Sequence, residues 1–125
     1  MIFSESLKKN RDFQKVYQNG KSKANKYLIL YYLENGSERN RIGISASKKV
    51  GNSVVRHRMC RLIRESYRLN ENSLKAGYDF VCVVRPQAKD RNFHEIESAL
   101  LHLLKLFGLI KEEKDNHEKN FDRND

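Results

Sequence analysis

Apolar residues recur at every third or fourth position in three stretches of the chain, and this period predicts helices. The stretches are residues 10–19, 53–69 and 91–107. The apolar side of the first stretch is aromatic, because it carries Phe13 and Tyr17 one turn apart. Residues suited to begin or end these helices stand at the expected places: Asn10, Gly20, Asn52, Ser53 and Gly108.

Three runs rich in branched and aromatic residues predict strands at 27–33, 41–47 and 78–85. A polar turn containing Asn35 and Gly36 joins the first two runs. The third run is almost continuously apolar, so we expect a central strand that is covered on both faces. Alternation divides the second strand into an apolar face, with Ile42, Ile44 and Ala46, and a small polar face, with Gly43, Ser45 and Ser47.

This order of elements predicts an α+β fold, a two-layer α/β sandwich with a mixed central sheet of about four strands and helices on one side. The expected order is helix, strand, strand, helix, strand, helix, with short edge strands hidden near the N-terminus or the turns. We expect one domain over residues 1–110. Residues 111–125 hold four basic and six acidic residues and almost no apolar ones, which predicts a charged, disordered tail.

Composition narrows the class of protein. The chain has 25 Lys and Arg against 16 Asp and Glu, a net charge of +9 that favours a polyanionic partner. The longest apolar run, around 78–84, is too short to cross a bilayer, and the first 20 residues lack a secretory apolar stretch, so we expect a cytoplasmic protein without a membrane partner. Cys60 and Cys82 stand alone, which argues against a disulfide framework or a structural zinc site.

The positive charge is concentrated between Lys48 and Arg68, a block with seven Lys or Arg and a single acid, Glu65. On a helix, the cations of this block gather opposite an apolar side. The apolar side is formed by Val55, Met59, Leu62, Ser66 and Leu69, and the opposite side by His57, Arg61, Arg64 and Arg68, flanked by Arg56 and Arg58. A solvated helix usually mixes both signs, so nucleic-acid binding is the favoured interpretation. Lys48 and Lys49 precede the helix, where free backbone N–H groups could contact a phosphate.

A second candidate surface is aromatic. Tyr27, Ile29 and Tyr31 share one face of the first strand, and Phe13 and Tyr17 lie one turn apart on the first helix. Such rings can stack on nucleobases, but they can also be ordinary packing between helix and sheet, and the sequence leaves both interpretations open.

Catalytic patterns are scarce. The four histidines, His57, His94, His102 and His117, have no metal-ligand spacing, and acidic residues cluster only in the expected tail. A nuclease needs a metal-binding carboxylate cluster or an acid–base pair. We therefore expect a binding protein with no catalytic residue and no metal or cofactor site of its own.

From about residue 7 to residue 109 the chain resembles the protein subunit of bacterial ribonuclease P. Three segments carry the resemblance: LKKNRDFQKVYQNGKSKAN, RIGISASKKVGNSVVRHRMCRLIRESYR and VVRPQA. The sequence departs from the family pattern where Arg56-His57-Arg58 replaces Arg-Asn-Arg and where Cys60 takes a commonly basic position. The resemblance implies a ribosomal protein S5 domain 2-like fold with a left-handed crossover, whereas handedness rules alone favour a right-handed one.

The resemblance also implies a function. In that family the RNA subunit performs the Mg²⁺-dependent removal of the 5′ leader from precursor tRNA, and the protein binds the leader and the catalytic RNA; DNA is not a partner. The implied contacts to the catalytic RNA are Lys48, Lys49, Arg56, His57, Arg58, Arg61, Arg64 and Arg68. The implied leader-binding cleft is lined by Phe13, Tyr17, Ile29, Tyr31, Ser45 and Ser47.

Two other functions remain open at this point. The chain could be a general RNA-binding or ribosomal-type protein without a role in tRNA processing, which copurification with bulk ribosomal RNA would indicate. It could also be a stand-alone endoribonuclease, although the sequence lacks an acid–base set.

Overall fold

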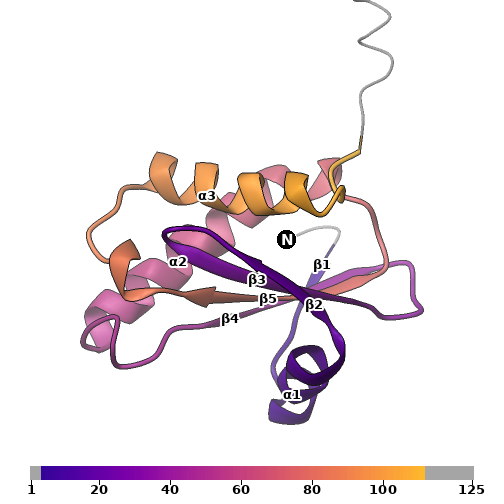
Figure 1. The fold of residues 1–125 in the computed structure, drawn as a ribbon, viewed down its shortest axis with the longest axis horizontal. Helices are drawn as coiled ribbons and strands as arrows, with labels where there is room; N and C mark the ends of the chain where they lie inside the picture. The colour runs from indigo at the N-terminus through magenta and orange to yellow at the C-terminus, as the bar shows by residue number, and fades with distance from the viewer. Residues whose placement is uncertain (1–3, 112–125) are drawn as a thin grey trace, which may run out of the picture.

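A computed structural model describes residues 4–111, which form a five-stranded sheet, three α-helices and two short 3-10 helices (Figure 1). The α+β prediction is confirmed. Residues 1–3 and 112–125 lie outside the described part, and most of the expected tail lies there with them. The elements in chain order are β1 (Ser4–Ser6), α1 (Asn10–Asn19), β2 (Lys21–Ala24), β3 (Leu28–Glu34), β4 (Asn40–Ser45), α2 (Ser53–Asn70), η1 (Glu71–Ser73), β5 (Tyr78–Val84), η2 (Pro86–Ala88) and α3 (Phe93–Leu106).

The sheet is mixed, with the strand order β1-β4-β5-β3-β2. Strands β1, β4 and β5 run parallel, and β3 pairs antiparallel with both β5 and β2. The sheet has more strands than the expected four. The edge strands β1 and β2, of three and four residues, are too short to show a clear pattern in the sequence. Strand β5 is inserted between β3 and β4, so the turn at Asn35 and Gly36 does not join two neighbouring strands. The parallel neighbours β4 and β5 are connected through α2, and the hand of this connection stays a prediction.

The helices lie on both faces of the sheet. Helices α2 and α3 cover one face, as expected, but α1 packs on the other (Figure 1). The reason lies in β5, which is apolar on both sides: Phe80 and Cys82 join the main core with α2 and α3, while Val81 joins a smaller core with Leu7 and Val16. The prediction that β5 is central and covered on both faces is confirmed.

Several helix ends follow the capping rules. The Asn52 side chain accepts a hydrogen bond from the Val55 N–H at 3.0 Å and thereby caps α2. Gly108, at a φ of 72°, follows the end of α3. The expected cap of α1 was wrong: Lys9 is its N-cap, and Asn10 is the first helical residue.

The buried side of α2 is turned slightly from the predicted one. Its buried residues are Met59, Ile63, Ser66 and Tyr67, whereas Leu69, placed on the apolar side, is 51% exposed. Tyr67 takes an inner position in the main core, where its hydroxyl is satisfied by a hydrogen bond of 2.8 Å with the Ser4 hydroxyl. None of the helices in residues 4–111 is long and apolar enough to span a membrane.

Candidate nucleic-acid interface

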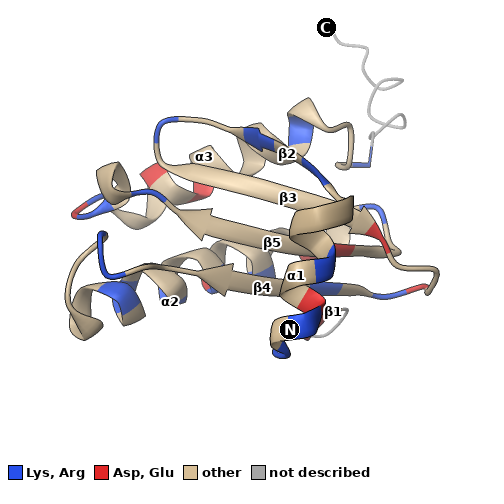
Figure 2. Cartoon of the chain, turned by 60° about the horizontal axis from the view of Figure 1, so that its bottom comes forward, with Lys and Arg blue, Asp and Glu red and all other residues tan. Residues whose placement is uncertain are grey.

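The outward side of α2 carries four exposed residues that we call the basic helix face: His57, Arg61, Arg64 and Arg68. Lys48 and Lys49 are also exposed, in the loop that leads from β4 into the helix (Figure 2). Glu65 pairs with Arg68 through two hydrogen bonds, which hold the pKa of the Glu65 carboxyl below its usual value. Within residues 4–111, Arg61 and Arg64 form no ion pair, although Glu65 lies one turn after Arg61 on the helix.

Arg56 and Arg58 flank this face, and both are half-buried. The Arg58 guanidinium donates a hydrogen bond from Nη2 to the backbone carbonyl of Arg91 at 3.1 Å, and its Nη1 lies 3.5 Å from the Met59 sulfur. Arg58 thus ties α2 to the segment before α3. Sequence periodicity could not reveal this contact, because its two partners are 33 positions apart.

On the opposite face of the sheet, α1 brings its aromatic side chains onto β3 and β4. The ring of Phe13 lies directly over Gly43: a Cβ atom at Gly43 would be 2.5 Å from the Phe13 Cζ. The Tyr17 and Tyr31 rings meet edge to face with centroids 4.9 Å apart, and Phe13 lies 6.4 Å from Tyr17. The sequence therefore needs a glycine at position 43 so that the helix can approach the sheet this closely.

The same face continues beyond α1 toward the carboxyl ends of β4 and β5, which are open to view in Figure 2. Ser45 pairs with Val83, and Val83 pairs with Ile29, so these three residues form one row across the sheet. All three are partly exposed, and Ser47 is exposed just after β4. We call the following residues the aromatic sheet face: Phe13, Tyr17, Ile29, Tyr31, Ser45 and Val83, together with Ser47 just beyond the end of β4.

The structure brings together the predicted aromatic residues with one exception. Tyr27 precedes β3, where strand alternation no longer holds, and its side chain packs against the core on the side of α2 and α3. The Arg91 guanidinium carbon lies 5.8 Å from the centroid of the Tyr27 ring. Tyr27 is therefore not part of the aromatic sheet face, contrary to the prediction from alternation.

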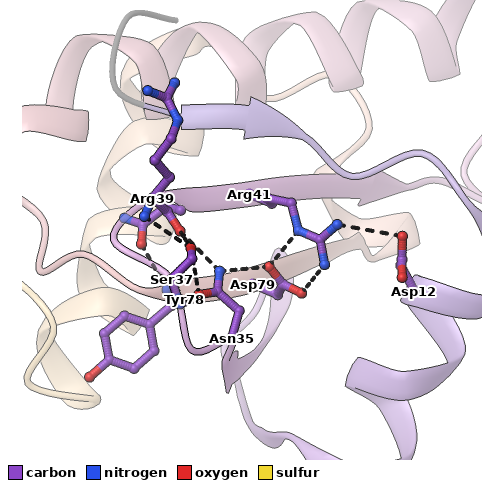
Figure 3. Close-up of polar contacts among 8 residues, drawn as sticks. Asp12, Asn35, Ser37, Arg39, Arg41, Tyr78 and Asp79 are labelled. Carbon is purple, nitrogen blue, oxygen red and sulfur yellow. Dashed lines mark hydrogen bonds and ion pairs between the residues drawn. The ribbon is translucent and has the colours of Figure 1, made fainter.

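The sequence patterns did not reveal an ion-pair network that joins α1 to strands β4 and β5 (Figure 3). Arg41 donates from Nε and Nη2 to the two carboxylate oxygens of Asp79, at 2.8 and 2.6 Å, and its Nη1 lies 3.6 Å from an Asp12 carboxylate oxygen. Burial by itself would raise the pKa of Asp79, but hydrogen bonds from Arg41 and Asn35 outweigh it and hold the pKa below its usual value. The sequence held one signal for this pair: Asp79 is a lone acid at the start of the apolar strand β5, and Arg41 stands at the start of β4.

The described residues offer little for catalysis. Between residues 4 and 111, no group of three His, Cys, Asp or Glu side chains is arranged to hold a metal ion. Cys82 is fully buried, and burial raises its pKa to about 12, so its thiol is not a nucleophile at neutral pH. A hollow of about 570 Å³ is lined by residues that belong to neither surface, among them Arg39, Glu71 and Lys111.

Comparisons with known proteins identify the family of the chain. The family model described as Ribonuclease P matches residues 2–108. The ribonuclease P protein component of Lachnoclostridium phytofermentans is 59% identical over 107 residues, which cover 86% of this chain and 92% of the relative. That of Alkaliphilus metalliredigens is 56% identical over 110 residues, covering 88% of this chain and 99% of the relative.

Solved structures of RNase P proteins have the same fold as this chain. The RNase P protein of Staphylococcus aureus superposes with a TM-score of 0.79 at 36% identity, covering 85% of this chain and 97% of the other. The protein from Thermotoga maritima superposes with a TM-score of 0.75 at 30% identity, covering 81% and 96%. The chain belongs to the ribonuclease P protein family, the protein components of the holoenzyme that removes the 5′ leader of tRNA.

Proposed function

We propose that the chain binds two RNAs at once: ribonuclease P RNA through the basic helix face, and the 5′ leader of precursor tRNA through the aromatic sheet face. The observation that carries the proposal is the separation of these surfaces, since α2 and α1 lie on opposite faces of the sheet (Figure 1). A protein built in this way can hold a leader on one side while it stays attached to the ribozyme on the other. Family membership favours this function in tRNA 5′ processing over the general RNA-binding or ribosomal-type alternative.

The contacts to the ribozyme would be mainly electrostatic. The exposed cations Arg61 and Arg64 present planar guanidinium groups, which bind phosphate through paired hydrogen bonds. Lys48 and Lys49 extend this surface at the N-terminal end of α2. The full set that we propose for this contact is Lys48, Lys49, Arg56, His57, Arg58, Arg61, Arg64 and Arg68.

The contacts to the leader would combine stacking and small polar groups. Phe13, Tyr17 and Tyr31 are partly exposed rings that form a fixed cluster, so little side-chain freedom is lost when a base stacks on them. Stacking of this kind tolerates any base, which suits a leader whose sequence differs from one tRNA to the next. Ser45 and Ser47 offer hydroxyl groups to the leader backbone.

Chemistry would remain with the RNA. We propose that Mg²⁺ serves the RNA-containing holoenzyme and that the protein holds no dedicated ion, in line with the lack of a three-ligand cluster in residues 4–111. No protein side chain is then assigned a step in the hydrolysis.

The test uses holoenzyme reconstituted from ribonuclease P RNA and the protein at low Mg²⁺. Affinity is measured for precursor tRNA with a long leader, for precursor with a single leader nucleotide, and for mature tRNA. Phe13→Ala and Tyr31→Ala should each weaken binding of the long-leader precursor by about 5- to 150-fold, the equivalent of about 1–3 kcal/mol per stacked base, and should leave mature tRNA unchanged.

The matched control is Phe107→Ala, because this ring is also half-buried but packs on Tyr32 at a centroid distance of 4.4 Å, on the side of α3. Phe107→Ala should not alter the preference of the holoenzyme for long-leader precursor over mature tRNA. If leader length makes no difference to the wild-type holoenzyme, the leader site is wrong. Cleavage of precursor tRNA by the protein free of RNA would overturn the assignment of the chemistry.

A further inference from the structure

Arg41 connects three elements around the aromatic sheet face. It belongs to β4, it binds Asp79 of β5 through two hydrogen bonds, and it faces Asp12 of α1 (Figure 3). Asp79 is almost completely buried and also accepts a hydrogen bond from Asn35 at 3.0 Å. The sheet therefore fixes the guanidinium plane, and Nη1 is the nitrogen directed toward α1.

The ion pair lies beside the ring that we assign to the leader. Asp12 directly precedes Phe13 in α1, and Gly43, two residues after Arg41 in β4, lies under the Phe13 ring. The first turn of α1 is thus held against β4 at two adjacent points, one electrostatic and one steric. Loss of the Arg41–Asp12 contact would remove the electrostatic one of these two points and leave this turn to apolar packing, chiefly that of Phe13 on Gly43.

We propose that Arg41 and Asp12 are positioning residues for the leader, acting through the place of Phe13 on the sheet. The inference rests on the proposed function of the aromatic sheet face. It assigns neither residue a direct contact with RNA.

For the variant Asp12→Asn, simple electrostatics and the positioning role predict opposite changes in affinity for the leader. Asp12→Asn removes a negative charge near a surface that binds a polyanion, and charge alone would then strengthen RNA binding. If Asp12 positions Phe13, the same substitution should instead weaken binding of the leader. Arg41 itself is a poor first variant, because its replacement would leave the buried Asp79 carboxylate without its ion pair and endanger folding.

The experiment compares Asp12→Asn, Asp12→Glu and the control Glu95→Gln in reconstituted holoenzyme. Glu95 is also in an ion pair, with Arg91 at 3.5 Å, but it lies on α3, on the other face of the sheet from α1. Asp12→Asn should weaken binding of the long-leader precursor about two- to fivefold, the range expected from a partly exposed ion pair, and leave mature tRNA unchanged. Asp12→Glu should restore most of the affinity, and Glu95→Gln should weaken binding of neither tRNA.

A double-mutant cycle separates positioning from general damage. In a Phe13→Ala background, Asp12→Asn should have no further effect on the leader, because the ring that it positions is gone. Far-UV circular dichroism checks that α1 remains folded in every variant. If Phe13→Ala weakens leader binding but Asp12→Asn does not, or if their effects add, the positioning role is overturned and the leader site stands. If Phe13→Ala has no effect, the proposed leader site is wrong and the inference falls with it.

Discussion

The close approach of α1 to the sheet makes Gly43→Ala an informative perturbation. The added Cβ would be 2.5 Å from Phe13 Cζ and 3.0 Å from both Cε atoms. Carbon atoms in favourable contact are about 3.5–4.0 Å apart, so the ring has to move by about 1 Å or tilt. Because Phe13 belongs to the aromatic sheet face, the substitution displaces this ring without changing its chemistry.

Two opposing terms set the expected change in stability. Overpacking of this kind costs about 1–3 kcal/mol, whereas Gly→Ala stabilises by about 0.4–1 kcal/mol where the backbone tolerates it. Gly43→Ala should therefore lower the free energy of unfolding by about 1–2 kcal/mol. In a Phe13→Ala background the clash is absent, and the same substitution should become neutral or slightly stabilising.

Urea unfolding of the four proteins in this cycle measures the free energies, and the binding assay with long-leader precursor measures the functional consequence. Gly43→Ala should also weaken leader binding, by less than Phe13→Ala does. If Gly43→Ala has the same cost in stability in both backgrounds, the Phe13 ring is not what the new methyl group meets, and the packing argument fails.

Other predictions concern the basic helix face and the buried ion pair. Arg61→Ala and Arg64→Ala should each weaken binding to ribonuclease P RNA and lower the slope of log K against log salt by about 1, as checked by titrations at several salt concentrations. Arg58→Ala should weaken the same binding and also lower the melting temperature, because Arg58 donates to the backbone between η2 and α3; Arg61→Ala should not lower it. Since the folded-state pKa of Asp79 lies below its unfolded value of about 3.9, its stabilising effect is present above that pH and is lost as pH falls through the folded pKa. The melting temperature of the wild type should accordingly fall more steeply below about pH 4 than that of Asp79→Asn, and equal slopes would contradict the ion pair.

Local features of the fold were predictable from the sequence. Residues 10–19 were predicted as a helix and form α1, because the period of apolar residues and Gly20 together define its extent. Strand alternation correctly separated Ile42 and Ile44 from Gly43, since the two faces of a strand are set by the chain alone. The same local patterns were enough to place the basic side of α2 outward.

Non-local features were not predictable in this way. The insertion of β5 between β3 and β4 depends on pairing between distant segments, which no local period encodes. An aromatic helix face fits either side of the sheet, and the prediction of helices on one side was wrong for α1. Leu69 is apolar yet exposed, and Arg58 is charged yet tied to the backbone of Arg91, because tertiary neighbours rather than residue type decide both.

The central claim is that two separate surfaces serve two RNAs, and the most direct test measures both affinities on the same variants. For each protein we would determine the affinity for ribonuclease P RNA and, at saturating protein, the ratio of affinities for long-leader precursor and mature tRNA. The account predicts that Phe13→Ala lowers the ratio and leaves RNA-subunit affinity unchanged, while Arg61→Ala combined with Arg64→Ala lowers RNA-subunit affinity and leaves the ratio unchanged. The division into two surfaces is contradicted if either variant changes both the RNA-subunit affinity and the affinity ratio. It is also contradicted if Phe13→Ala changes only the RNA-subunit affinity and the double arginine variant changes only the ratio.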